Sequence, residues 1–224
     1  MNKDMNGRGN TDWDWLSWDA PSGKKNHFPS KPASAQHDFY LCGDVKRAEE
    51  YIEWFNLIRN AGPNDVITFY INSYGGDMYS ALQMISCIRE TQAHTLCYVE
   101  GACMSAATMI ALACDSFMVS PESVWMIHNY SGGAVGKGGE MADQLEFERR
   151  WSVKFLNDIY DGFLTPEEIQ RVLDGKDFWL DADEVIDRLI IRAEAMGIDY
   201  VSEEPETPAP KKKVSKKKKV SKKK

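Results

Sequence analysis

Short apolar runs alternate with segments of helical periodicity along residues 38–129, and this alternation constrains the fold more than any other feature. The run VITFYI at 66–71 is too apolar and too rich in β-branched residues for a surface helix, so it predicts a strand. Further strands are predicted at 38–42, 95–101, 116–121 and 124–129, and helices at 45–62, 78–90 and 104–115. Strands alternating with helices indicate an α/β fold with a mostly parallel sheet and right-handed crossovers.

The segment after this alternating region predicts one long helix, at about 139–162, and two short ones. Trp151, Phe155 and Ile159 form an apolar stripe at i, i+4 spacing on the long helix. We expect this stripe to exceed what one small domain hides, and therefore to form an interface in a large oligomer. Thr165 and Glu168 predict a capping box at the start of the next helix, and DADE at 181–184 repeats the signal before a helix at 185–197.

Composition divides the chain into an acidic body and a basic end. The net charge is −7, but the last fourteen residues, KKKVSKKKKVSKKK, hold ten lysines and no acid. Without those lysines, residues 1–210 carry 17 basic against 34 acidic residues. We predict a disordered Trp-containing arm at 1–36, a compact folded domain at 37–200, and a linker with a disordered lysine-rich tail at 201–224. The tail is expected to bind an acidic partner or nucleic acid.

The sequence also limits the compartment and the chemistry. No run of eighteen apolar residues predicts a membrane span, and the N-terminal residues contain no apolar signal-peptide core. The five cysteines, an odd number without CxxC spacing, are expected to be reduced and buried. We therefore expect a cytoplasmic protein without a metal site.

Four motifs carry possible chemistry. NSYGG at 72–76 follows a strand and has glycine N–H groups that an oxyanion could use. GACMSAAT places Ser105 at a strand-to-helix junction among small residues, where the Ala106 N–H could pair with that of Gly76. VWMIHN places His128 at the end of a strand, where it could act as a general base. Taken singly, each motif is more simply explained as an ordinary turn, a helix-packing serine or a structural histidine.

The fourth motif, KDFWLDADE, supplies the acid that a catalytic triad needs. An acid at Asp177 could accept a hydrogen bond from His128 and hold its tautomer. Three other carboxylates compete for that role, and spacing alone does not choose among them: Asp174, Asp181 and Asp183.

Together, YINSYGG, GACMSAA, MIHN and KDFWLDADE resemble segments of ClpP, the proteolytic subunit of the Clp protease, from about Phe39 to Ile190. The resemblance puts the nucleophile on Ser105, the base on His128, the acid on Asp177, and the oxyanion hole on Gly76 and Ala106. Tyr74 stands where the family usually has proline, and the family's usual Tyr-Gly-Leu-Ile-Asp ending is here DRLII. This divergence is similar to that of phage-encoded ClpP-like enzymes.

The resemblance implies a ClpP/crotonase-like fold with a protruding long "handle" helix, and subunits in stacked rings. It also implies a serine endopeptidase that needs no cofactor and works with an ATP-dependent AAA+ unfoldase or in phage head maturation on protein or peptide substrates. Two rivals remain. A crotonase-type acyl-CoA enzyme would need only the oxyanion N–H groups, whereas a non-catalytic ring subunit or assembly scaffold would be expected to lack the serine or the histidine.

Overall fold

The structure is a computed structural model that describes residues 34–197. The predicted arm at 1–36 and tail at 201–224 therefore lie almost wholly outside the described residues. The elements in chain order are β1 (Gln36–Val45), the 3-10 helix η2 (Ala48–Tyr51), α1 (Ile52–Asn60), β2 (Val66–Gly76), α2 (Met78–Glu90), β3 (His94–Met104), α3 (Ala106–Ala111), β4 (Ser116–Val119), β5 (Val124–Ile127), α4 (Gly138–Tyr160), α5 (Pro166–Leu173), β6 (Phe178–Asp181) and α6 (Ala182–Ala195).

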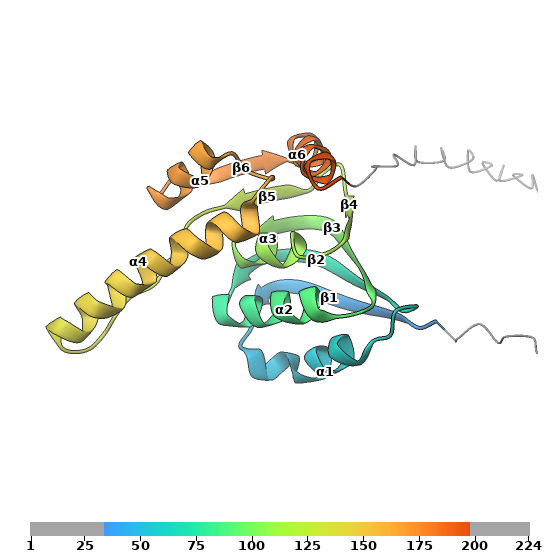
Figure 1. Ribbon diagram of the computed structural model, residues 1–224, viewed down its shortest axis with the longest axis horizontal. Helices are drawn as coiled ribbons and strands as arrows, with labels where there is room; N and C mark the ends of the chain where they lie inside the picture. The colour runs from blue at the N-terminus through green and yellow to red at the C-terminus, as the bar shows by residue number, and fades with distance from the viewer. Residues whose placement is uncertain (1–33, 198–224) are drawn as a thin grey trace, which may run out of the picture. The chain divides into compact units, whose positions relative to one another are not determined.

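One sheet organises the domain. Its strand order is β1-β2-β3-β5-β6, with β4 pairing to β3 beside β5. Every pairing is parallel except that of β5 with β6, which is antiparallel. The predicted α/β class with a mostly parallel sheet is confirmed, and Figure 1 shows α4 projecting from the body as the predicted long helix.

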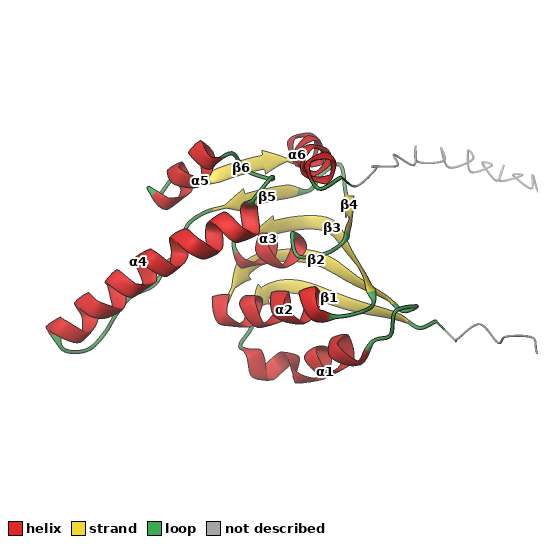
Figure 2. Cartoon of the chain, in the orientation of Figure 1, coloured by secondary structure: helices red, strands yellow, loops and turns green. Residues whose placement is uncertain are grey.

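The core lies between the sheet and the helices that cover one of its faces. Figure 2 shows α1, α2 and α3 on the same side of β1, β2 and β3. Side chains at alternate strand positions point into this layer: Ile67, Phe69 and Ile71 of β2 are fully buried. This alternation follows from the period of two residues in a strand, and it leaves the other face of the sheet to different side chains.

Several predicted elements have other bounds in the structure; the helix expected over 104–115, for example, is only α3 at Ala106–Ala111. Two differences have a clear cause in strand pairing. The helix expected over 45–62 begins later, because Val45 is still paired with Gly76 in the β1–β2 ladder and Arg47 has an extended backbone. Residues 178–181 were expected only to precede a helix, but they form β6 on the edge of the sheet. The two aromatics of that segment divide between the faces: Phe178 is partly buried against the core, whereas Trp179 is 59% exposed.

The apolar stripe on α4 is not the exposed patch that the sequence predicted. Phe155 and Ile159 are only 8% and 3% exposed, and Trp151 is half-buried with its ring 4.8 Å from that of Phe155. The C-terminal half of α4 packs against the body of the domain, and Phe155 and Ile159 belong to the hydrophobic core of the domain. The prediction that this stripe is left exposed for an oligomer interface is therefore wrong.

The predicted signals at the ends of helices are confirmed. Thr165 and Glu168 form the capping box of α5, and Asp181 forms another with Glu184 at the start of α6. All five cysteines are free; four are buried as expected, whereas Cys42 is exposed. Within residues 34–197, no helix is long and apolar enough to cross a membrane.

Candidate active site

Ser105 occupies a strained turn between β3 and α3. It is the one residue other than glycine with positive φ in the described part of the chain, with φ 52° and ψ −125°. Such a backbone costs on the order of 1–3 kcal/mol and persists only where the surroundings fix it. The Ser105 N–H donates to the carbonyl of Met126 on β5 at 2.7 Å, which ties the turn to the neighbouring strand. A strained serine held in this way is a candidate functional residue.

A buried pair of hydroxyls holds the other side of this turn. Thr108 Oγ1 donates to the Ser105 carbonyl at 2.7 Å and lies 2.6 Å from the hydroxyl of Tyr160 at the end of α4. Because the threonine proton is used on that carbonyl, Tyr160 is the donor in the second bond. Burial raises the pKa of Tyr160, which keeps this phenol protonated. The end of α4 is thereby connected to the position of Ser105.

The side chain of Ser105 meets His128. The Ser105 Oγ to His128 Nε2 distance is 2.7 Å, and both residues are partly buried. His128 follows β5 directly, and β5 pairs with β3 up to Met104, so the sheet brings the two residues together. A neutral histidine that accepts the serine proton at Nε2 carries its own proton on Nδ1 and so needs an acceptor there.

Asp177 precedes β6, the strand that pairs with β5, and is therefore a candidate acceptor for the Nδ1 proton of His128. The β5–β6 ladder pairs Ile127 with Phe178, so the next positions along the two chains are His128 and Asp177. Within residues 34–197, no hydrogen bond joins these two side chains, and Asp177 is exposed. Its assignment as the acid therefore stays a prediction.

The competing carboxylates have other partners or positions. Asp174 accepts from the Gln170 amide at 2.9 Å, and Asp181 caps α6 by accepting from the Glu184 N–H. Asp183 lies in the first turn of α6. Register thus favours Asp177 over the other three.

The glycine turn after β2 lies directly against the serine. A Cβ added to Gly75 would fall 2.6 Å from Ser105 Cβ and 3.0 Å from the Ala106 nitrogen, so only glycine fits there. Gly76, the residue that the sequence favoured, pairs instead with Val45, and a Cβ on it would lie 2.3 Å from that residue's carbonyl oxygen. As the first residue of α3, Ala106 has an N–H without an intrahelical partner. The oxyanion roles of Gly76 and Ala106 stay predictions.

Sequence reasoning missed three parts of this arrangement: the contact of Gly75, the carbonyl of Met126, and the link from Thr108 to Tyr160. The adjacent glycines at 75 and 76 signalled a turn without showing which one touches the serine. Pairing of the predicted strands could have suggested that the Met126 carbonyl accepts a hydrogen bond from Ser105. No pattern in the sequence predicts a contact between Thr108 and Tyr160, which lie 52 positions apart.

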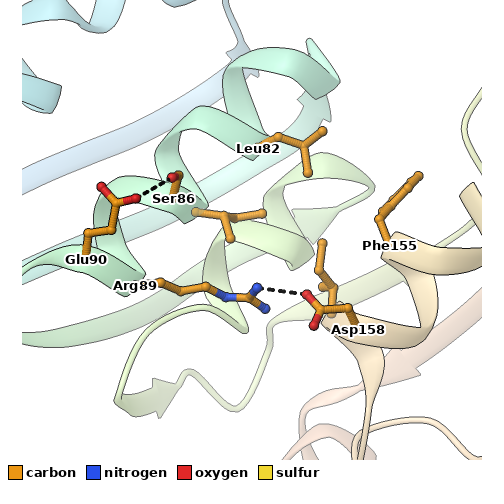
Figure 3. Close-up of a pocket in the computed structure, with 8 residues that line it drawn as sticks. Leu82, Ser86, Arg89, Glu90, Phe155 and Asp158 are labelled. Carbon is orange, nitrogen blue, oxygen red and sulfur yellow. Dashed lines mark hydrogen bonds and ion pairs between the residues drawn. The ribbon is translucent and has the colours of Figure 1, made fainter. Parts of the chain in front are cut away.

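A cleft lies away from this serine. This cleft of about 290 Å³ between α2 and α4 is lined by Leu82, Ile85, Ser86, Arg89, Glu90, Phe155, Asp158 and Ile159. Figure 3 shows Arg89 and Asp158 facing each other across it, with 2.8 Å between Nη1 and Oδ2. None of these residues belongs to the arrangement around Ser105. Among residues 34–197, no group of three or more His, Cys, Asp or Glu side chains could hold a metal.

Comparison with known proteins decides the family. The family model described as Clp protease matches residues 39–192, well over half of the chain. The chain belongs to the Clp protease family. The matched region contains all of the Ser105, His128 and Asp177 segments. The further likeness to phage-encoded members stays a prediction.

Curated relatives agree with this family. The ATP-dependent Clp protease proteolytic subunit 2 of Pseudomonas aeruginosa is 27% identical over 150 residues, covering 64% of this chain and 72% of its own. The ATP-dependent Clp protease proteolytic subunit of Bacteroides thetaiotaomicron is 28% identical over 168 residues, covering 70% and 72%. That of Leuconostoc citreum is 32% identical over 132 residues, covering 55% and 64%.

A solved structure supports the fold. The chain is similar to a point mutant of ClpP1 from Listeria monocytogenes, with a TM-score of 0.56 and 24% identity over 68% of this chain and 86% of that one. At this identity the likeness concerns the arrangement of helices and strands.

Proposed function

We propose that this member of the Clp protease family is a serine endopeptidase with Ser105 as its nucleophile. The observation that carries the proposal is the 2.7 Å distance between Ser105 Oγ and His128 Nε2, at the one strained non-glycine turn of residues 34–197. A nucleophile within hydrogen-bond reach of a base is the recurring arrangement of covalent peptide hydrolysis.

In the proposed acylation, Ser105 Oγ attacks the scissile carbonyl carbon while His128 Nε2 takes the hydroxyl proton. The imidazolium then gives this proton to the leaving amine, and an acyl-serine remains. A water molecule repeats the sequence with His128 again as base, releasing the acid product and restoring the hydroxyl. No step requires a cofactor.

The negative charge that develops on the carbonyl oxygen is assigned to the N–H groups of Gly76 and Ala106. Removal of one such donor typically costs about 10²–10³ in rate, so each of these two groups is expected to contribute strongly, although less than the nucleophile itself. The position of Gly75 against Ser105 Cβ supports this assignment, because it keeps the glycine turn close to the reacting hydroxyl.

Asp177 is proposed to orient His128 and to stabilise its cation. Its support is the β5–β6 register, because the last pair of that ladder, Ile127 with Phe178, is followed by His128 on one chain segment and preceded by Asp177 on the other. Asp177→Asn should lower kcat/KM by about 10²–10⁴ with little change in KM. Asp174→Asn is the matched control. If Asp174→Asn lowers activity and Asp177→Asn does not, the acid of the triad is Asp174 and not Asp177.

The rivals are less well supported. A crotonase-type enzyme has no use for a serine hydrogen-bonded to a histidine, and a non-catalytic ring subunit has no need to keep both residues in contact. The test is hydrolysis of a short fluorogenic peptide by the full chain, by Ser105→Ala and by His128→Ala. Both variants should lose activity while remaining folded, and turnover retained by either would refute its assigned role.

The family implies subunits in stacked rings that receive substrates from an ATP-dependent unfoldase; no GxxxxGK[ST] motif for nucleotide binding occurs in this chain. We propose the same assembly here, with the projecting half of α4 in the ring contacts. That half exposes Leu145 and Phe147, at 49% and 57%. Light scattering should return a mass several times that of the monomer, and a monomer at micromolar concentration would contradict the proposed assembly.

An enclosed chamber also predicts selectivity by size. Without a partner or ATP, short peptides should be cut, unfolded proteins cut slowly, and a folded protein left intact. Rapid cleavage of the folded protein would indicate open sites, as expected for phage head maturation.

A further inference from the structure

The face of the sheet opposite α1, α2 and α3 carries a row of three tyrosines. Tyr40, Tyr70 and Tyr98, here called the tyrosine row, occupy paired positions of β1, β2 and β3. The ring centroids are 4.8 Å apart for the first pair and 5.8 Å for the second. Tyr40 is 59% exposed, and Met118 on β4, paired with Tyr98, continues the row at 50% exposed. The tyrosine row is therefore an aromatic surface that no described residue covers fully.

Acidic side chains lie beside the tyrosine row. Asp38 precedes the row by two positions on β1, and Glu100 follows it by two positions on β3, so both lie on the same face; both are exposed. The alternate positions of β1, β2 and β3 that share this face hold no lysine or arginine. Burial and, after it, the charges of Asp38 and Glu100 raise the pKa of Tyr70 in the middle of the row.

We propose that the tyrosine row and its two carboxylates bind the lysine-rich segment 211–224 of the same chain. That segment has ten lysines and no acid, so its charge is complementary to that of the two carboxylates. Ammonium groups are attracted to tyrosine faces, and the aliphatic stems of lysine cover apolar surface while the charge stays in water. A purely apolar partner would leave Asp38 and Glu100 without a role.

The chain is long enough for this contact. Fourteen residues lead from Gly197, the last described residue, to Lys211. They span at most about 45–50 Å, whereas a domain of about 160 residues has a radius of gyration of about 15 Å. The helix before them, α6, packs against β4, which is the strand next to Tyr98. The segment can therefore reach the tyrosine row on its own domain.

Zero-length carbodiimide cross-linking of the full chain, read by mass spectrometry, tests the contact directly. Amides between lysines of 211–224 and either Asp38 or Glu100 should exceed those to Glu53 and Glu167 at least about fivefold at low salt. Glu53 and Glu167 are exposed acids on α1 and α5. The preference should fade at about 1 M salt, where the screening length is about 3 Å. Amides spread evenly over exposed acids would overturn the proposal.

Binding by a separate peptide gives a second readout. A fluorescent peptide of residues 207–224 should bind a chain that ends at residue 206, as measured by anisotropy. Asp38→Asn with Glu100→Gln should weaken binding about five- to thirtyfold, and Tyr40→Ala about two- to fivefold. Glu53→Gln with Glu167→Gln removes the same charge and should change binding less than twofold.

Three results would contradict the tail contact: no saturable binding, equal loss in the control pair, or complete displacement of the peptide by a stoichiometric oligonucleotide. The last would instead make nucleic acid the partner of the tail. None of these results bears on peptide hydrolysis, which does not involve the tyrosine row.

Discussion

Gly75→Ala is the change whose effect can be worked out most fully, because the added methyl would meet the nucleophile. The new Cβ would lie 2.6 Å from both the Met104 carbonyl oxygen and Ser105 Cβ. Carbon atoms in contact normally stand about 3.5–4.0 Å apart, so the glycine turn and the serine turn must separate by about 1 Å. Neither partner is the end of a flexible side chain, so the backbone has to move.

A displacement of about 1 Å at a nucleophile costs about 10²-fold in rate, equivalent to about 2.7 kcal/mol in the activation free energy. Gly75 also has φ of +87°, which an alanine adopts at a cost of roughly 1–2 kcal/mol in the free energy of unfolding. Gly43→Ala is the matched control, because Gly43 has φ of +77° but no atom within 4 Å of an added Cβ.

The assay combines urea unfolding with hydrolysis of a fluorogenic peptide. Gly43→Ala should lose roughly 1–2 kcal/mol in the free energy of unfolding from its positive φ alone, and Gly75→Ala should lose more because its methyl also clashes. Only Gly75→Ala should lose about 10²-fold in kcat/KM. Equal activity of the two variants would refute the claim that Gly75 sets the position of Ser105.

Two further predictions concern the groups that support the site. Thr108→Val should lower the free energy of unfolding by about 1–3 kcal/mol, because it leaves the buried Tyr160 hydroxyl without its acceptor, and adding Tyr160→Phe should recover part of that loss in a double-mutant cycle. Hydrogen bonding from Arg188 lowers the pKa of Glu168 in the folded protein, so the pair stabilises the fold above the ordinary carboxyl pKa and loses this effect as pH falls through the lowered value. Urea unfolding should therefore show a deficit for Glu168→Gln at pH 7 that shrinks as pH falls below the ordinary carboxyl pKa of 4.5; a deficit independent of pH would contradict it.

The sequence predicted the features that depend on local pattern. The strand at 66–71, the capping box of Thr165 and the position of Ser105 between strand and helix all follow from neighbouring residues. The features that failed depend on distant partners. Val45 stays in a strand because it pairs with Gly76, and residues 178–181 form a strand because they pair with β5.

The site divides in the same way. Ser105 and His128 were found from their motifs, and the structure brings their side chains into contact. The choice of Gly75 or Gly76, and of Asp177 among four acids, depends on register and on contacts that sequence spacing does not encode. The apolar stripe of α4 shows the opposite error: a correct helical periodicity gave no information on which surface would cover Phe155.

The most direct test of the central claim, that His128 activates Ser105 for attack on a carbonyl, is the reaction of the folded protein with a fluorophosphonate probe. Peptide mapping by mass spectrometry identifies the modified residue. The account predicts modification of Ser105 alone among the serines, slowed at least about 10²-fold by His128→Ala and absent in the unfolded chain. Modification of a different serine, or peptide cleavage that continues while Ser105 stays unmodified, would contradict it.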